Sequence, residues 1–122
     1  MGSIINVVYR LYSLLIGVDI PADVRIGKDF RISHPSGIVV NGNTIIGDNV
    51  WIRCNTCIGG DYNGENAPII GNNVNIGANV CIIGNIRIGN NVEIGAGTVV
   101  VKDIPDNTVV VGNPGRIIKF KT

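Results

Sequence analysis

The chain has 122 residues, of which 45% are hydrophobic but only 5% aromatic, and its net charge is +1. This length suits one domain with its own core, and the near-neutral charge without a basic cluster argues against a nucleic-acid partner. The 17 glycines and the many isoleucines and valines favour thin, regular β-structure over a helical bundle.

The first expected element is a short helix over residues 1–17. The apolar stretch "IINVVYRLYSLLIG" contains Arg10 and is too short to cross a membrane. It shows neither the basic start nor the cleavage site of a signal peptide. We therefore expect an amphipathic helix that packs on one end of the domain and caps it. Whether it touches a membrane or a partner is left open, and we expect the chain to be cytoplasmic.

Residues 18–104 carry a repeat of six residues. Isoleucine recurs at every sixth position, the next residue is often glycine, and the fourth residue after it is small or β-branched. The repeat isoleucines run from Ile20 to Ile38, from Ile46 to Ile58 and from Ile70 to Ile94. A period of six fits neither an α-helix nor a two-sided strand.

This period is typical of an all-β fold, the left-handed parallel β-helix of hexapeptide repeats. Three hexads form one triangular turn, so each isoleucine is expected to stack on the one eighteen residues later. We expect the isoleucines to point inward at the corners, and the Gly-Asn and Asn-Asn pairs to accept the positive φ that corners require.

Three segments depart from the repeat. Two extra residues lie within Asn41–Thr44, and "GGDYNGENAP" at residues 59–68 has no hexad character. We expect the longer insertion to be a loop thrown out from the coil, and leave open whether it is ordered without a ligand. Residues 105–122 leave the repeat and are expected to cap its second end.

Cys54 and Cys57 form a C-x-x-C pair, which by itself is a weak metal or redox signal. Neither a second pair nor a nearby histidine completes a zinc site. We therefore interpret these cysteines as ordinary wall positions of the repeat and expect no metal.

His34 is the only histidine of the chain and occupies the third place of the hexad "ISHPSG". We expect it to face outward and to meet the 59–68 loop in a cleft, where it would act as a general base toward a hydroxyl. Asp19 lies fifteen residues earlier, close to one full turn, and is expected to hold the imidazole. The alternatives are an exposed histidine without a role and an aspartate that only caps a turn.

From Val18 to Lys119 the sequence resembles the hexapeptide-repeat acyltransferases, and among them the serine acetyltransferases. "DIPADVRIGKDFRISHPSGIVV" is similar to the segment that holds the family's catalytic histidine and its paired aspartate. "TCIGG" resembles the strand that ends in two glycines before the family's loop, and the segments after residue 69 resemble its coenzyme A-binding coils. The resemblance implies that His34 and Asp19 are the catalytic pair.

The resemblance further implies direct acetyl transfer from acetyl-CoA to a hydroxyl, without a covalent acyl-enzyme and without a metal. The Gly60 N–H would receive the thioester oxygen or the pantetheine. The small residues Ala78 and Ala96 would lie against the pantetheine, in a groove between the subunits of a homotrimer. The candidates for the coenzyme A phosphates are Lys102, Arg116 and Lys119.

The chain departs from the serine-specific pattern at the residues that would bind the acceptor. The family has an aspartate directly before the histidine, where this chain has Ser33, and an Arg-His pair in the loop, where it has Asn66 and Ala67. A zwitterion needs charged partners, whereas a sugar needs neutral ones. We therefore expect a sugar or polysaccharide acceptor bound by Ser33, Asp61 and Asn66, with serine as the alternative. A non-catalytic β-helix scaffold is the rival of another class.

Overall fold

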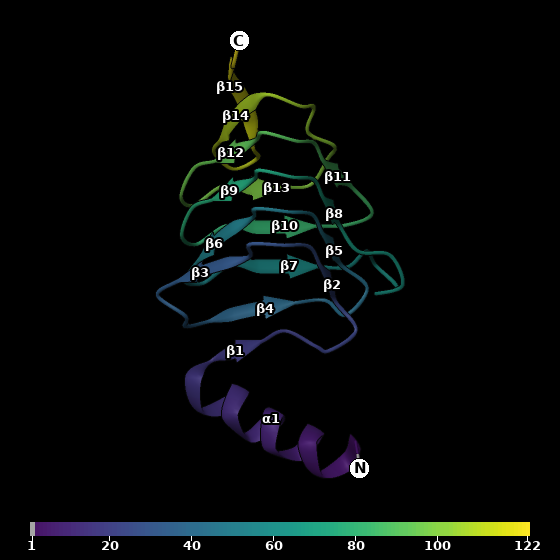
Figure 1. Cartoon of the computed structure of the whole chain (residues 1–122). Coiled ribbons are helices and arrows are strands. Elements are labelled where there is room, and N and C mark those ends of the chain that lie inside the picture. Colours follow the sequence, from purple (N-terminus) through teal and green to yellow (C-terminus); the bar gives the residue numbers. More distant parts are fainter. Residues whose placement is uncertain (1) are drawn as a thin grey trace.

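The computed structural model describes residues 2–122, in which a single helix leads into a triangular coil of short strands (Figure 1). Helix α1 (Gly2–Ile16) lies beneath the coil, and the strands stack above it as three walls. This arrangement confirms the predicted parallel β-helix. No helix in the described part of the chain is both long and apolar enough to cross a membrane.

The three walls are called A, B and C here, and each turn of the chain passes through them in that order. Wall A consists of β1 (Val18–Asp19), β4 (Ile38–Val40), β7 (Cys57–Gly59), β10 (Cys81–Ile83) and β13 (Val99–Val100). Wall B consists of β2 (Arg25–Ile26), β5 (Ile45–Ile46), β8 (Ile69–Ile70) and β11 (Arg87–Ile88). Wall C consists of β3 (Arg31–Ser33), β6 (Trp51–Arg53), β9 (Asn75–Ile76), β12 (Glu93–Ile94), β14 (Thr108–Val111) and β15 (Arg116–Phe120).

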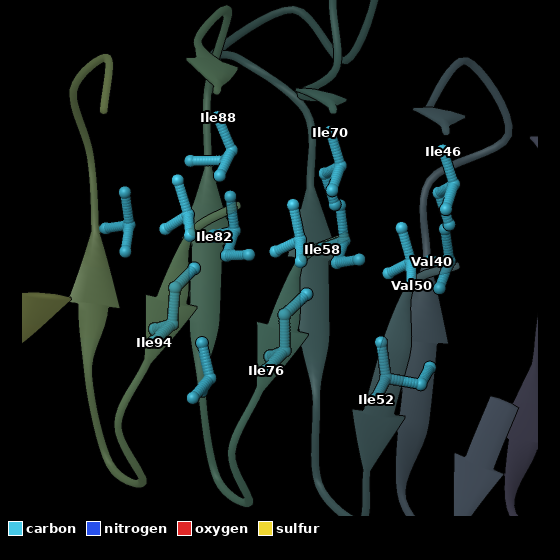
Figure 2. Packing of buried hydrophobic residues seen from close by; sticks show 14 of the residues in the cluster. Val40, Ile46, Val50, Ile52, Ile58, Ile70, Ile76, Ile82, Ile88 and Ile94 are labelled. Atoms are coloured by element: carbon cyan, nitrogen blue, oxygen red, sulfur yellow. The ribbon is translucent and has the colours of Figure 1, made fainter. Parts of the chain in front are cut away.

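The repeat isoleucines fill the interior of the coil (Figure 2). Ile52, Ile76 and Ile88, for example, are completely buried. Our expectation that they point inward at the corners is wrong in one respect, because they lie within the strands, as Ile52 does in the middle of β6. The corners themselves carry asparagines with positive φ, among them Asn49 at 56° and Asn73 at 57°.

The glycine that follows many repeat isoleucines has a different role from the one we expected. Gly47 and Gly71 do not adopt a positive φ. A Cβ atom on Gly71 would lie 2.8 Å from the carbonyl oxygen of Gly89 in the next coil, and one on Gly47 would lie 2.7 Å from that of Gly71. Glycine is therefore needed here because the backbones of successive coils approach closely.

The stacking interval varies along the chain. Ile70 pairs with Ile88, eighteen residues later as expected. Ile58 pairs with Ile82 across the inserted loop. In the first coil it is Val18, and not Ile20, that pairs with Ile38. The first coil is thus two residues longer than the repeat predicts. Our placement of the two extra residues within Asn41–Thr44 is wrong, because Ser33 pairs with Arg53 and Val39 pairs with Cys57, which puts them at the His34 corner.

The far end of the coil continues beyond residue 104. Ile104 is buried and forms a parallel bridge with Ile88, and Val110 in β14 is completely buried. Strand β15 then runs antiparallel to β14. It covers the last edge of wall C and so closes this end of the solenoid.

The helix α1 lies at the other end and turns a mixed face toward the coil, since Tyr9 and Leu14 line the cavity there together with polar residues. Ser13 is buried, with 9% exposure, whereas Leu14 and Leu15 are 80% and 85% exposed. The polar residues Asn6 and Arg10 line a cavity against the first coil. An amphipathic helix that packs on a core normally buries its apolar residues, whereas most of those in α1 are exposed.

Candidate functional site

The corners of successive coils stack into edges, and two of these edges carry the predicted site residues. The "histidine edge", between walls C and A, comprises the corners at residues 34–37, 54–56, 77–80 and 95–98. The "loop edge", between walls A and B, comprises the corners at residues 20–24, 41–44, 60–68, 84–86 and 101–103. His34, Ala78 and Ala96 therefore share the histidine edge, whereas Gly60 and Lys102 lie on the loop edge.

His34 lies directly after β3, at the lowest complete corner of the histidine edge. Its φ is 56°, a left-handed conformation that histidine tolerates better than most residues. The corner is fixed by a hydrogen bond in which Asn55 N–H donates to the Ser36 carbonyl oxygen at 2.8 Å. His34 is exposed, as we expected. Its imidazole is thus presented to an outside substrate.

Asp19 does not reach His34 as the sequence led us to expect. It is exposed in β1 and pairs in register with Val39, not with the histidine corner, and among residues 2–122 no hydrogen bond joins it to the imidazole. The physical reason is that β3 is the outermost strand of wall C, so that no strand of the coil lies beneath His34. Asp19 instead faces a cavity at the foot of wall A.

Ala78 and Ala96 continue the histidine edge above His34. The N–H of Gly97 donates to the Ala78 carbonyl oxygen at 2.9 Å, and the N–H of Asn79 donates to that of Cys54 at 3.0 Å. Ala78 is half-buried and Ala96 is exposed. The edge is therefore a backbone-bonded strip with small side chains, along which an extended ligand can lie.

The loop at residues 60–68 is held by its own hydrogen bonds. Asn66 Nδ2 donates to Asp61 Oδ2 at 2.8 Å, and this bond from Asn66 lowers the pKa of Asp61 below its usual value. Asn43, in the turn of the coil below, donates through Nδ2 to the Glu65 carbonyl oxygen at 3.0 Å. A Cβ on Gly60 would lie 2.9 Å from Asn41 Nδ2 and 3.0 Å from the Asn66 carbonyl oxygen, so a larger residue here would shift Asn41 and the loop.

The three residues expected to bind the acceptor do not gather in one place. Asp61 and Asn66 bind each other, and the Ser33 hydroxyl accepts a hydrogen bond from Trp51 Nε1 at 2.8 Å. The loop and His34 lie on opposite sides of wall A. The cleft that we expected between them is therefore not formed within one chain.

The candidate cations lie on the loop edge and at the far end of the coil. Lys102 follows β13, and Arg116 and Lys119 belong to β15, with all three side chains exposed. Arg31 and Arg53 instead form cation–π contacts, because their guanidinium groups lie 4.3 Å and 4.1 Å from the centre of the Trp51 ring.

The cysteines form a pair that the C-x-x-C motif did not indicate. Cys57 lies directly beside Cys81 in the register of β7 and β10. Burial, and then the neighbouring Cys81, raise the pKa of the Cys57 thiol. Both residues directly precede a repeat isoleucine, and this shared hexad position was the signal that could have paired them. Among residues 2–122 no group of three or more potential metal ligands is found.

A cavity of about 560 Å³ lies between α1 and the first coil. Asn6, Arg10 and Ser13 line it from the helix, and Asp19 and Asp23 line it from the coil. Sequence reasoning missed this cavity because the helix was expected to seal that end of the coil. The signal was the spacing of the polar residues within α1, which places them on one side of the helix.

Comparisons with known proteins identify relatives along almost the whole chain. Residues 67–102 match the family described as "Bacterial transferase hexapeptide (six repeats)". Serine acetyltransferase 1, chloroplastic, of Arabidopsis thaliana is 46% identical over 106 residues, which are 85% of this chain and 34% of that protein. Serine acetyltransferase of Bacillus pumilus (strain SAFR-032) is 37% identical over 120 residues, which are 97% of this chain and 54% of that protein.

Solved structures give the same result. The crystal structure of serine acetyltransferase from Brucella abortus strain S19 matches with a TM-score of 0.85 and 37% identity, over 89% of this chain and 45% of that chain. A structure of the Brucella abortus enzyme in complex with coenzyme A matches with the same score over 90% of this chain and 45% of that chain. The chain thus spans about half the length, or less, of the relatives that it matches.

Proposed function

Since the chain is a serine acetyltransferase-like hexapeptide-repeat protein, we propose that it transfers the acetyl group of acetyl-CoA to the hydroxyl of L-serine. The observation that supports this most directly is the identity of 37% to a serine acetyltransferase over 97% of the chain. That aligned region includes both the His34 corner and the 60–68 loop. Relatives named for serine favour it as acceptor over the sugar that the loop composition led us to expect.

His34 is the general base of the proposed reaction. Its imidazole takes the proton of the acceptor hydroxyl while that oxygen attacks the thioester carbonyl carbon. A carbon–oxygen bond forms and the carbon–sulfur bond breaks, and the departing coenzyme A thiolate recovers the proton from the imidazolium. The Gly60 N–H donates to the carbonyl oxygen as negative charge develops on it. Asp19 is kept as a proposed partner of His34, to be reached when substrate is bound.

We propose that the complete site forms between two subunits of a homotrimer. What supports this is the separation of the two half-sites by wall A, with His34 on one edge and Gly60 on the other. Val39, on the outer face of wall A, is 49% exposed and is an apolar residue for such an interface. The histidine edge of one subunit would then lie against the loop edge of the next, in a heterologous contact that closes into a ring.

Coenzyme A would lie in the groove between these edges. Ala78 and Ala96 on the histidine edge leave room for the pantetheine arm. Lys102 on the loop edge, with Arg116 and Lys119 in β15, would bind the phosphates. One of the similar solved structures is a serine acetyltransferase with coenzyme A bound, which supports this co-substrate for the present chain.

A saccharide hydroxyl is the second candidate acceptor. The loop at residues 60–68 contains no lysine, arginine or histidine that could bind the carboxylate of an amino acid. Tyr62 in the same loop is completely exposed, at 102%. An exposed ring with the amide side chains of Asn63 and Asn66 in the same loop is suited to a sugar.

The test is a measurement of coenzyme A thiol release from acetyl-CoA with L-serine and with a panel of mono- and oligosaccharides. We expect L-serine to react with a kcat/KM of about 10⁴ M⁻¹s⁻¹ or more, as is ordinary for enzymes. A saccharide that reacts much faster than serine would overturn the choice of acceptor but not acetyl transfer. If no acceptor reacts and calorimetry detects no binding of acetyl-CoA, the chain is a scaffold.

A further inference from the structure

Two cysteines lie side by side on the outer face of wall A. Strands β7 and β10 stack one above the other (Figure 1), and their parallel register places Cys57 beside Cys81 and Ile58 beside Ile82. Both isoleucines are completely buried. Because successive side chains of a strand point to opposite faces, both cysteines point away from the core on the same face of the wall. Both are half-buried free thiols.

The two thiols are in contact with each other. Burial is the main cause that raises the pKa of the Cys57 thiol, and Cys81 raises it further, in part through a hydrogen bond between the two side chains. In the register of wall A, Val39 lies next to Cys57 on one side, and Val99 lies next to Cys81 on the other. The pair is therefore flanked by apolar side chains, and each thiol has the other as its neighbour.

Cys54 has a different place in the coil. It lies on the histidine edge, where its carbonyl oxygen accepts a hydrogen bond from Asn79 N–H at 3.0 Å. The corner stacked on it, residues 77–80, contains no cysteine. The C-x-x-C spacing thus brings Cys54 and Cys57 together in the sequence, whereas the coil brings Cys57 and Cys81 together in space. Cys54 is the matched comparison for the pair.

The spacing of the two strands fits a strained disulfide. Neighbouring strands lie about 4.7–4.9 Å apart. Because stacked coils are related by a simple shift, about the same spacing separates the two Cβ atoms. A disulfide accepts Cα atoms about 4.4–6.8 Å apart but brings its Cβ atoms to about 3.5–4.5 Å. The bond would therefore draw the two strands together by up to roughly 1 Å. Disulfides strained in this way are easily reduced again.

We propose that Cys57 and Cys81 form a dithiol site that is oxidised reversibly by a low-molecular-weight disulfide. The thiolate of one cysteine attacks a sulfur of the small disulfide, whose S–S bond breaks, and a mixed disulfide forms as one small thiolate leaves. The other cysteine then attacks the protein-bound sulfur, so that the Cys57–Cys81 bond forms and the second small thiolate leaves. The small disulfide gains the two electrons that the pair loses, and the two thiolates take up its two protons.

The disulfide would act on the strand that leads to the 60–68 loop. Gly60 follows Cys57 by three residues. Between them, Gly59 pairs with Ile83 of β10, and a Cβ atom on Gly59 would lie 2.9 Å from Ile83 Cδ1, so the two strands are already close here. A shift of β7 would move the Gly60 N–H, the proposed donor to the thioester oxygen. A misplacement of about 1 Å can cost about 10²-fold in rate, so oxidation should slow acetyl transfer. This consequence rests on the proposed function.

The first test maps the disulfide in the full chain. The protein is equilibrated with mixtures of oxidised and reduced glutathione in mildly alkaline buffer, because the raised pKa of Cys57 leaves little thiolate at neutral pH. The remaining thiols are alkylated, and cleavage before Asp61 separates Cys57 from Cys81 for mass spectrometry. We expect the two peptides to be linked, with a yield that rises with the ratio of oxidised glutathione to the square of reduced glutathione.

Three variants identify the cysteines that are linked. Cys54→Ser should form the link as the wild-type chain does, whereas Cys57→Ser and Cys81→Ser should not form it. Because wall A lies between the two edges proposed to contact other subunits, a disulfide between subunits is the competing product, and it appears as a covalent dimer in non-reducing electrophoresis. A link to Cys54, a covalent dimer in place of the internal link, or no link with either glutathione or the smaller oxidised dithiothreitol overturns the proposal.

The second test measures the effect on catalysis after glutathione has been removed. Consumption of acetyl-CoA by the linked wild-type chain should be up to about 10²-fold slower than by the reduced chain, and dithiothreitol should restore the rate. Cys81→Ser given the same oxidative treatment should keep its rate. An unchanged rate in fully linked protein overturns the effect on catalysis. If the reduced chain shows no acetyl transfer, the proposed function fails, and the peptide map still decides whether the dithiol site exists.

Discussion

At the scale of single residues, the corner after β3 shows how the coil presents a reactive group. Several corners of the coil place an asparagine in the left-handed conformation, as at Asn49, Asn55 and Asn73. His34 takes the same conformation, with φ 56°. The residue that stacks on Asn55 is Gly37, whereas His34 lies in the part of this corner that is two residues longer than the corner above it.

The shared conformation gives a clean test of His34. His34→Asn is expected to preserve the melting temperature, because asparagine adopts the left-handed conformation of His34 more readily than most residues do. It should lower kcat/KM by on the order of 10² to 10⁴, the usual contribution of a general base. The affinity for acetyl-CoA, measured by calorimetry, should stay unchanged. Full activity in this variant would refute the proposed mechanism.

The Cys57 thiol should react slowly with alkylating reagents at neutral pH. Burial and the neighbouring Cys81 raise its pKa, and the thiolate is the reactive form. Labelling with iodoacetamide at pH 7 to 10, followed by mass spectrometry, should show slower modification than in a free cysteine peptide, with an increase only in the alkaline range. Because the pKa is raised in the folded state, the neutral thiol supports folding below the unfolded-state pKa, and this contribution is lost as the pH rises through the folded-state value. Fast labelling of Cys57 at pH 7 in the folded chain would contradict this.

At the scale of elements, the strands of the coil could be predicted and the placement of α1 could not. The period of six determines which residues point inward, and Ile52, Ile76 and Ile88 are buried as the pattern indicates. The first coil departs because Ile38 and Val40 are both apolar and lie two positions apart. Either could stack on Ile58, and only the register of β4 on β7, in which Val40 pairs with Ile58, decides between them.

The orientation of α1 was unpredictable for a related reason. Hydrophobic periodicity shows that a helix has two faces, but the face that meets the coil also depends on what else the assembly packs against it. The cavity, with Arg10 and Asp23, was missed as a consequence. A candidate site formed between two elements requires their relative placement, which no local pattern contains.

The interior of the coil and the exposed face of α1 should respond differently when a side chain is shortened. Ile76→Ala removes a completely buried side chain and should lower the free energy of unfolding by about 2–5 kcal/mol. Leu15→Ala removes a side chain that is 85% exposed and should change it by less than about 0.5 kcal/mol. Chemical denaturation of both variants measures the difference. A large loss in Leu15→Ala would show that the outer face of α1 is covered by another subunit in solution.

At the scale of the whole molecule, the coil separates the groups that the proposed reaction needs. The resemblance identified His34 and Gly60 from short motifs, but the sequence could not show which corners share an edge. That depends on the number of residues in each coil, and the insertions at the His34 corner and at residues 60–68 change this number. With the register known, His34 and Gly60 lie on opposite edges of wall A. A single chain therefore holds two half-sites.

Mixing two inactive variants tests whether neighbouring subunits combine these half-sites. His34→Asn disables the histidine edge, and Gly60→Val is expected to disable the loop edge, since a side chain there would press on the loop backbone, with its Cβ 3.0 Å from the Asn66 carbonyl oxygen and 3.1 Å from Gly64 Cα. Each variant alone should form inactive trimers. In trimers assembled from an equal mixture, a site is intact wherever the wild-type histidine edge of one subunit meets the wild-type loop edge of the next. Random assembly gives about a quarter of such sites, so the mixture should recover up to about a quarter of the wild-type rate of coenzyme A release. Sedimentation establishes that mixed trimers have formed, and refolding each variant separately before mixing is the control. If mixed trimers form and remain as inactive as their parents, each site belongs to one chain and the subunit boundary does not contain it.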